Sequence, residues 1–183
     1  MRKLLFLPII ILVLGFINSC SESEYSDVWT QYAEWRKENE NWILMQANLR
    51  NPDGTLYYDK VVPAWNNNAY ILMHFFNDTT ETSGNLVPMF TSTVAVKYKG
   101  RLYDDTPFDS SYLMKDSLYI TTSEQVISGW QIALANMHVG DSCEIIIPYE
   151  EGYFYQGAGL IPPFSCLTFN MKLVDIPYYE VKP

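Results

Sequence analysis

Histidine and cysteine, two of the residue types most often used for catalysis or metal binding, are few in this sequence and widely spaced. His74 and His138 are far along the chain from each other, and no cluster has the spacing of metal ligands. Cys143 and Cys166 either pack as small hydrophobic side chains or form a disulfide in an oxidising compartment. The sequence therefore indicates no metal, no other cofactor and no activated nucleophile, and any chemistry must come from other residues.

More informative is a series of short motifs in the C-terminal half of the chain, rich in aromatic residues and glycine. In chain order they are VKYKG at 96–100, FDSS at 108–111, VISGW at 126–130, MHVG at 137–140, IIP at 146–148, GY at 152–153, IPP at 161–163 and LTF at 167–169. Their order and spacing resemble those of the FKBP-type peptidyl-prolyl cis–trans isomerases over residues 69–176. Any one of these short motifs is a weak signal for the family, whereas the ordered set is a strong one.

The resemblance implies that nine residues meet around one pocket, which binds an X-Pro segment of a polypeptide. These residues are Tyr98, Phe108, Asp109, Val126, Ile127, Trp130, Tyr153, Ile161 and Phe169. Matched by motif, Tyr98 and Phe108 form part of the pocket wall, Trp130 forms its floor and Phe169 lines the far side. Asp109 places its carboxylate beside the mouth of the pocket.

Two hydrogen-bonding groups complete the implied site. Tyr153 matches the family tyrosine whose hydroxyl binds a substrate carbonyl, and the backbone N–H of Ile127, after Val126, matches the main donor to the ligand. Ile161 lies on the rim. Rotation about an X-Pro bond must cross a barrier of about 18–20 kcal/mol, and a pocket that binds the twisted form better than the planar form lowers it. No cofactor is implied, and the expected partners are polypeptides that contain X-Pro bonds.

Two positions depart from the family pattern. Phe154 stands where the family has a glycine after the tyrosine. The segment between Phe108 and Trp130 is one residue shorter than usual, with residues 117–119 where the family often has a pocket phenylalanine. We therefore expect an altered flap at 154–160 and one altered pocket wall, while the floor and the two hydrogen-bonding groups stay in place.

The segments around these motifs predict the scaffold that positions them. Candidate strands are 70–76, 93–102, 118–121, 142–147 and 167–175, and a helix is expected at about 126–137. Five strands and one short helix predict an α+β domain, with an antiparallel sheet that has the helix on one face. The resemblance makes this a curled sheet wrapped around the helix, in a domain that spans residues 69–183.

Residues 20–68 are predicted to form an extension before this domain. Residues 21–26 have the composition of a polar tether, and 27–48 the pattern of an amphipathic helix, in which Trp35, Trp42 and Met45 recur near helical spacing. The turn NPDG at 51–54 ends that helix. Its aromatic stripe either packs on the domain or binds a partner or a second copy, and the sequence leaves the oligomeric state open.

Residues 1–19 have the pattern of a bacterial lipoprotein signal peptide. Two basic residues precede the apolar stretch 4–16, which is shorter than the ~20 residues that a membrane-spanning helix needs. Ile17, Ser19 and Cys20 resemble a lipobox, whose cysteine is lipidated and becomes the first residue of the mature protein. This predicts export and a lipid anchor at Cys20, with the outer membrane as the expected location. The alternative is a plain secretory signal followed by an ordinary thiol.

The charge and the motifs together leave three functional hypotheses. The formal net charge of −9 makes binding to the phosphates of a nucleic acid an unfavourable role. The first hypothesis is an isomerase that acts on exported proteins. The second is a binding or chaperone module that uses the same pocket without appreciable turnover, and the third is a structural envelope lipoprotein. Turnover of an X-Pro peptide distinguishes the first hypothesis from the second.

Overall fold

The computed structural model describes residues 20–179, with side chains from residue 23 onward. The predicted signal peptide, 1–19, and the side chain of Cys20 lie outside the described residues, so the lipid anchor stays a prediction. Within residues 20–179, no helix is long and apolar enough to cross a membrane.

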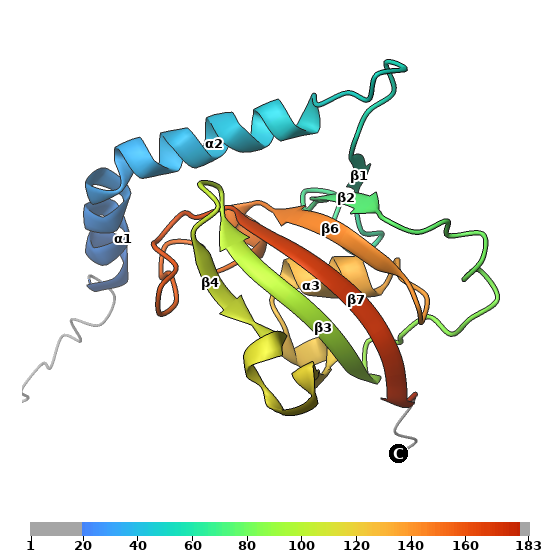
Figure 1. Ribbon diagram of the computed structural model, residues 1–183. Coiled ribbons are helices and arrows are strands. Elements are labelled where there is room, and N and C mark those ends of the chain that lie inside the picture. The colour runs from blue at the N-terminus through green and yellow to red at the C-terminus, as the bar shows by residue number, and fades with distance from the viewer. Residues whose placement is uncertain (1–19, 180–183) are drawn as a thin grey trace, which may run out of the picture.

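Among the described residues, seven strands form one antiparallel sheet (Figure 1). Its order is β1-β2-β6-β7-β3-β4, and β5 pairs with the first half of β3. The strands are β1 (Asp59–Val61), β2 (Ile71–Phe75), β3 (Thr93–Leu102), β4 (Pro107–Ser110), β5 (Tyr119–Thr122), β6 (Ser142–Ile147) and β7 (Leu167–Tyr178). The β3–β7 ladder runs from Thr93↔Tyr178 to Leu102↔Leu167. It therefore places the motif at 96–100 beside the motif at 167–169.

Most predicted elements are present with shifted ends, and two strands were not predicted. The bounds of β3 and β6 equal the predicted ones, whereas the helix predicted at 126–137 is shorter, α3 (Ser128–Leu134). It begins later than predicted because Ile127 is extended (ψ 152°). β1 and β4 are short and have no clear pattern in the sequence. β1 lies within the predicted extension yet pairs with β2, so the sheet begins before residue 69. The predicted α+β class, with an antiparallel sheet and one short helix, is confirmed.

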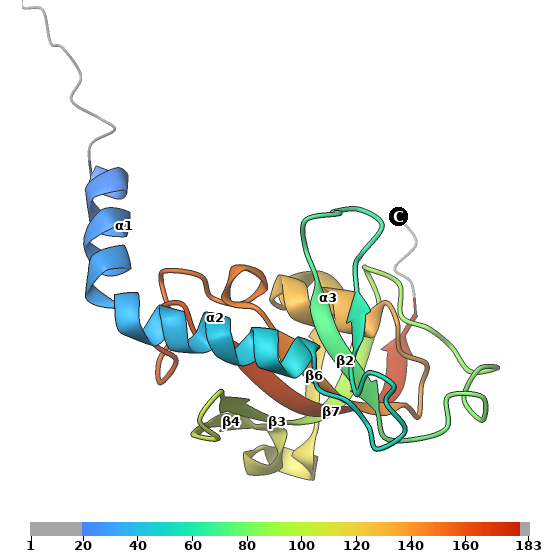
Figure 2. The same cartoon turned by 90° about the horizontal axis from the view of Figure 1, so that it is seen from above.

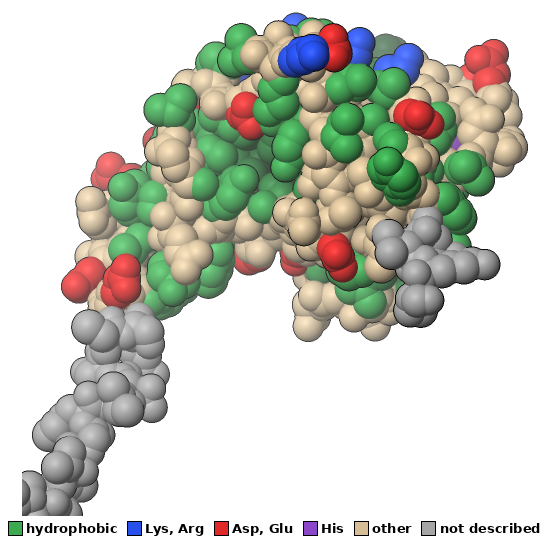
Figure 3. All heavy atoms as spheres, turned by 90° about the horizontal axis from the view of Figure 1, so that it is seen from below, with side chains coloured by type: hydrophobic (Ala, Val, Ile, Leu, Met, Phe, Trp, Pro, Cys, Tyr) green, Lys and Arg blue, Asp and Glu red, His purple; other side chains and the backbone are tan. Residues whose placement is uncertain are grey.

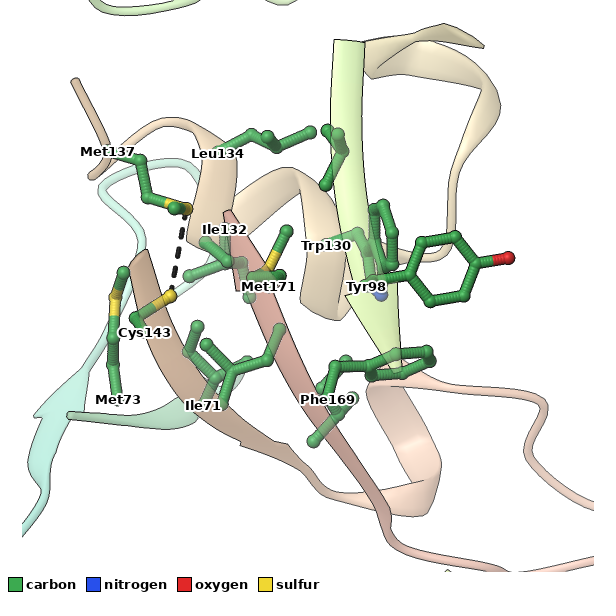
Figure 4. Packing of buried hydrophobic residues seen from close by; sticks show 14 of the residues in the cluster. Ile71, Met73, Tyr98, Trp130, Ile132, Leu134, Met137, Cys143, Phe169 and Met171 are labelled. Atoms are coloured by element: carbon green, nitrogen blue, oxygen red, sulfur yellow. Dashed lines mark hydrogen bonds between the residues drawn. The ribbon is translucent and has the colours of Figure 1, made fainter. Parts of the chain in front are cut away.

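The main core lies between α3 and one face of the sheet. Ile145 and Ile147 of β6 belong to this core, whereas Ile146, between them, belongs to a second cluster on the opposite face. Helix α3 comes so close to the sheet that a Cβ at Gly129 would lie 2.4 Å from Cγ2 of Ile147. In Figure 4, aromatic rings gather at one end of the core, and Met137 and Cys143 lie at the other.

Cys143 and Cys166 are both buried free thiols. Cys143 lies in the main core, 3.7 Å from the sulfur of Met137, and Cys166 lies in the second cluster, where its thiol contacts the carbonyl oxygen of Asn39 at 3.7 Å. Burial raises the pKa of both thiols, that of Cys166 to about 12. Of the two alternatives, the structure has the cysteines packed as small hydrophobic side chains and not joined in a disulfide.

The N-terminal extension consists of two helices, α1 (Cys20–Gln31) and α2 (Ala33–Ala47), which meet at a bend (Figure 2). The prediction of a helix at 27–48 is confirmed in that residues 27–31 and 33–47 are helical, whereas the predicted tether at 21–26 is wrong because α1 includes these residues. The chain leaves helical geometry at Tyr32 (ψ 20°). There Arg36 donates a 2.8 Å hydrogen bond to the carbonyl of Trp29 and lies 3.3 Å from the centroid of its ring. This bond satisfies a carbonyl that the end of α1 leaves without a helical partner.

Helix α2 packs on the face of the sheet opposite α3. Ile43 is buried in the second cluster with Leu72 of β2 and Ile146 of β6. The remaining short helices are of the 3-10 type: η1 (Ser111–Leu113), η2 (Lys115–Ser117), η3 (Ser123–Gln125) and η4 (Tyr149–Glu151). Of the predicted stripe, Trp35 and Trp42 pack on the domain, whereas Met45 is 63% exposed, so packing on the domain accounts for the two tryptophans only.

Candidate active site

A cavity of about 520 Å³ opens beside α3, and it brings together all nine predicted site residues. They come from the strands β3, β4 and β7, from α3 and the loop before it, and from the loop that follows β6. Five further lining residues were not named as site residues by the sequence analysis: Tyr119, Gln125, Ala158, Gly159 and Leu160. The resemblance gave a signal only for Tyr119, through the altered segment 117–119.

Aromatic rings form the inner surface of the cavity. The ring of Trp130, 4% exposed, lies 5.0 Å from that of Tyr98 and 5.2 Å from that of Phe169, both nearly perpendicular to it. Phe108 meets Phe169 edge-on at 5.4 Å. Such edge-to-face pairs are favourable because the ring edge is positive and the face negative. Figure 4 shows Tyr98, Trp130 and Phe169 converging from β3, α3 and β7.

Gly100 of β3 makes this arrangement of rings possible. A Cβ at this position would lie 2.6 Å from Cε2 of Phe108 and 2.9 Å from Cε1 of Phe169. We expect Gly100→Ala to push both rings into the cavity and to weaken binding of an X-Pro peptide by about tenfold, with a loss of about 1–3 kcal/mol in the free energy of unfolding. Peptide titration and urea unfolding measure the two effects. Gly84→Ala, where the added Cβ has no neighbour within 4 Å and the backbone has no positive φ, is a control for glycine replacement, and equal peptide affinity in both variants would contradict the steric account.

A short hydrogen bond joins two of the predicted residues at the mouth of the cavity. The hydroxyl of Tyr98 donates to Oδ2 of Asp109 at 2.5 Å. Burial, followed by this carboxylate, raises the pKa of Tyr98 above its usual value of 10.0. Burial also raises the pKa of Tyr153, with Asp109 as the second cause. Both phenols are therefore neutral at physiological pH and can donate hydrogen bonds.

Because the pKa of Tyr98 is raised, the free energy of unfolding depends on pH in the alkaline range. The folded protein keeps the Tyr98 proton above pH 10, whereas the unfolded chain loses it, so the free energy of unfolding falls as pH rises from 10 through the folded-state pKa. We expect Tyr98→Phe to make this fall less steep. Urea unfolding between pH 8 and about 11 tests this. An equal slope in the two proteins would show that burial and the Asp109 contact do not raise the pKa of Tyr98.

Two possible hydrogen-bond donors at the cavity have no partner within the described part of the chain. These are the backbone N–H of Ile127 and the hydroxyl of Tyr153, and both residues line the cavity. The side chain of Gln131 donates to the carbonyl of Val126 at 2.9 Å and so fixes the loop that presents the Ile127 N–H. Both donors are free to bind a carbonyl of a ligand.

Comparison with known proteins identifies the domain that holds this cavity. The family model of the FKBP-type peptidyl-prolyl cis–trans isomerases matches residues 86–174. These residues form an FKBP domain. The FKBP-type 22 kDa isomerase of Escherichia coli is 43% identical over 91 residues, which cover 49% of this chain and 44% of that protein. FkpA of the same species is 37% identical over 99 residues, which cover 52% of this chain and 36% of FkpA.

A solved structure supports the same assignment. The crystal structure of a peptidyl-prolyl cis–trans isomerase from Pseudomonas syringae superposes with a TM-score of 0.63 and 27% identity, over 79% of this chain and 95% of the other. The likeness therefore extends over most of that chain. The match to each of the two Escherichia coli relatives spans less than half of the relative's length.

The segment 117–119, for which the sequence predicts an altered pocket wall, contains Tyr119, the first residue of β5. Its ring lies 5.8 Å from that of Tyr98 and 6.3 Å from that of Trp130. An aromatic ring therefore lines the cavity at the segment where the sequence predicts a changed wall.

Within residues 20–179, no group of three or more His, Cys, Asp or Glu side chains is arranged to hold a metal ion.

The flap of the FKBP domain is the loop 149–164, which carries Tyr153 and the rim. Ala158 and Ile161 exchange two backbone hydrogen bonds of 2.8 and 2.9 Å at its tip. Gly157 has φ +63°, and a Cβ there would lie 2.5 Å from the carbonyl oxygen of Ile161, so the tip requires glycine. The hydroxyl of Ser128 donates to Glu151 and links the start of α3 to the base of the flap.

Proposed function

We propose that this chain catalyses the cis–trans rotation of X-Pro bonds in exported polypeptides. The observation that carries the proposal is the convergence of the nine motif residues on one cavity, with Trp130 as its floor and unpartnered donors at Ile127 and Tyr153. The FKBP-type family match over residues 86–174 supports it.

The proposed mechanism needs binding groups and no reactive group. The planar X-Pro amide is stabilised by resonance, which makes its carbonyl and nitrogen dipolar, and rotation destroys that resonance. A cavity lined with aromatic rings solvates the planar amide poorly, so it favours the twisted form by comparison. The N–H of Ile127 and the hydroxyl of Tyr153 hold carbonyl groups of the substrate, while the prolyl ring rests on Trp130.

A protease-coupled assay on an X-Pro peptide tests this function. We expect the purified chain to accelerate isomerisation, and Tyr153→Phe to lower kcat/KM by about tenfold, since it removes one hydrogen bond to the substrate. Tyr178→Phe, on an exposed residue at the end of β7, is the matched control and should behave as the wild type. A folded wild-type protein without any acceleration would refute the proposed activity.

A Pro-peptide-binding or chaperone module that uses the same cavity is the second candidate function. Exposed hydrophobic side chains at the mouth favour it: Leu160 lines the cavity and is 74% exposed. Seen from below, hydrophobic side chains cover much of this molecular face, with Asp and Glu side chains scattered among them (Figure 3). Tight peptide binding without acceleration of the rotation would establish this candidate in place of the enzyme.

We also propose that the chain is an exported lipoprotein, anchored through Cys20 at the outer membrane. The support is the signal-like pattern of residues 1–19 and the lipobox-like residues before Cys20. Two or more acyl chains hold a protein stably on a bilayer. Cys20→Ser should move the protein from the membrane to the soluble fraction, and mass spectrometry of the wild type should find a lipidated Cys20. An unmodified Cys20 in the membrane fraction would contradict the anchor.

A further inference from the structure

Phe154 lies in the flap at the position where the family has a glycine. Its backbone has a conformation that suits glycine. Its φ is +49°, in the left-handed region that a bulky residue seldom adopts. Such a conformation costs energy and persists only where surrounding contacts impose it. The contacts of the Phe154 ring therefore bear on what holds the flap in place.

The ring of Phe154 stacks with two tyrosines. Tyr149, at the base of the flap, lies 6.1 Å away with an interplanar angle of 20°, and Tyr25, from α1, lies 6.0 Å away at 27°. Tyr25 also meets Tyr155 edge-on at 5.3 Å. A residue of the N-terminal extension thus takes part in the packing of the flap.

Further contacts tie both helices of the extension to the same segment. Trp29 of α1 packs edge-on against the buried ring of Phe164 at 5.4 Å. In α2, the indole N–H of Trp35 donates to Ser165 at 3.0 Å, and Glu40 accepts a 3.2 Å hydrogen bond from the Tyr149 hydroxyl. The extension therefore holds the flap segment at both ends and in its middle.

The same segment supplies one side of the cavity. Tyr153, directly before Phe154, lines the cavity, as do residues 158–161 at the tip of the flap. Residues 153 and 154 thus have different neighbours: the first belongs to the cavity, the second to the cluster with α1. Displacement of Phe154 moves the peptide unit that carries Tyr153.

We propose that Tyr25 and Phe154 are positioning residues, through which α1 sets the place of Tyr153 and of the rim 158–161 for an X-Pro polypeptide. This inference rests on the proposed function of the cavity. It assigns to the N-terminal extension a part in substrate binding, and it explains why a bulky aromatic residue occupies the strained position of the flap. A preorganised flap binds more tightly because less freedom is lost on binding.

The primary test is the Tyr25→Ala variant of the purified chain. We expect KM for an X-Pro peptide to rise by about tenfold while kcat changes less than about twofold, because the flap loses its preorganisation and the floor is unchanged. Tyr25→Phe keeps the stacked ring and should keep the wild-type KM. Trp42→Ala is the matched control, since it removes an aromatic ring of the same extension that contacts Tyr103 and not the flap.

A double-mutant cycle locates the coupling. Phe154→Gly restores the family residue and removes the ring on which Tyr25 stacks. In that background, Tyr25→Ala should change KM by less than about twofold, since the interaction that it removes is already absent. A full tenfold rise in the Phe154→Gly background would show that Tyr25 does not act through Phe154 and would overturn the assignment.

Amide hydrogen exchange gives a readout that does not depend on turnover. The backbone N–H groups of residues 154, 156, 157, 158 and 161 donate hydrogen bonds within the flap. Their exchange should become at least about tenfold faster in Tyr25→Ala and stay at the wild-type rate in Tyr25→Phe. If the wild type shows no isomerase activity, the proposed function fails, and this exchange measurement alone decides the positioning role. An unchanged KM or unchanged exchange in Tyr25→Ala would overturn that role.

Discussion

Trp130→Leu is expected to lower kcat/KM for an X-Pro peptide by about two orders of magnitude. The indole forms the floor of the cavity and packs edge-on against Tyr98 and Phe169. Leucine leaves part of the floor empty and removes both ring contacts, so the prolyl ring loses its packing surface. The substitution should also cost about 2–4 kcal/mol in the free energy of unfolding, because Trp130 is only 4% exposed.

The control for this loss is the same substitution at a tryptophan outside the cavity. Trp42 lies in α2, packs on the second cluster and contacts Tyr103. Trp42→Leu should reduce stability and leave kcat/KM within about twofold of the wild type. Steady-state kinetics at a temperature where circular dichroism shows both variants folded separates the two effects. Equal losses of activity in the two variants would mean that Trp130 acts through stability alone.

Asn39→Ala should give the largest loss of stability of any single polar substitution in α2, about 2–4 kcal/mol. Asn39 is 0% exposed, and its Oδ1 accepts a 2.8 Å hydrogen bond from the backbone N–H of Cys166. Its Nδ2 donates to the carbonyl of Trp35 at 2.8 Å. Alanine leaves the buried Cys166 N–H without a partner, and an unsatisfied buried donor costs more than the lost bond itself.

Asn48, the C-cap residue of α2, provides a matched control. Its Nδ2 also donates to the carbonyl four residues earlier, Leu44, at 2.8 Å, but the side chain is exposed. Asn48→Ala should cost less than about 0.5 kcal/mol. Urea unfolding of both variants measures the difference. A similar small loss at Asn39 would show that the Cys166 bond does not hold the extension on the domain.

The sequence predicted the fold class and the set of residues at the cavity because both depend on local, ordered signals. The bounds of β3 and β6 equal the predicted ones, since β3 alternates hydrophobic with charged residues along its second half and β6 ends in three isoleucines directly before Pro148. The motif residues converge because the β3–β7 pairing and the position of α3 follow from the family order of elements. Tyr119 was indicated only as part of the segment 117–119, for which the sequence predicts an altered pocket wall.

The extension was predicted less well because its structure depends on contacts made by distant residues. Residues 21–26 are polar and carry no clear helical pattern, yet α1 includes them, and its Tyr25 and Trp29 pack on Phe154 and Phe164. Arg36 stabilises the break at Tyr32 through its hydrogen bond to the carbonyl of Trp29. This contact exists only in the bent chain, so the sequence alone does not indicate it. The departure at Phe154 was noticed in the sequence, but its stacking partner from α1 could not be read from spacing.

The most direct test of the central claim is NMR exchange spectroscopy of an X-Pro peptide with a catalytic amount of isotopically labelled protein. We predict exchange cross-peaks between the cis and trans forms that are absent without protein, together with a shift of the Ile127 amide resonance as the peptide is added. Both signals should be lost in Trp130→Leu. A folded wild-type protein that gives neither exchange cross-peaks nor a shift at Ile127 would contradict the claim that this cavity binds and rotates X-Pro bonds.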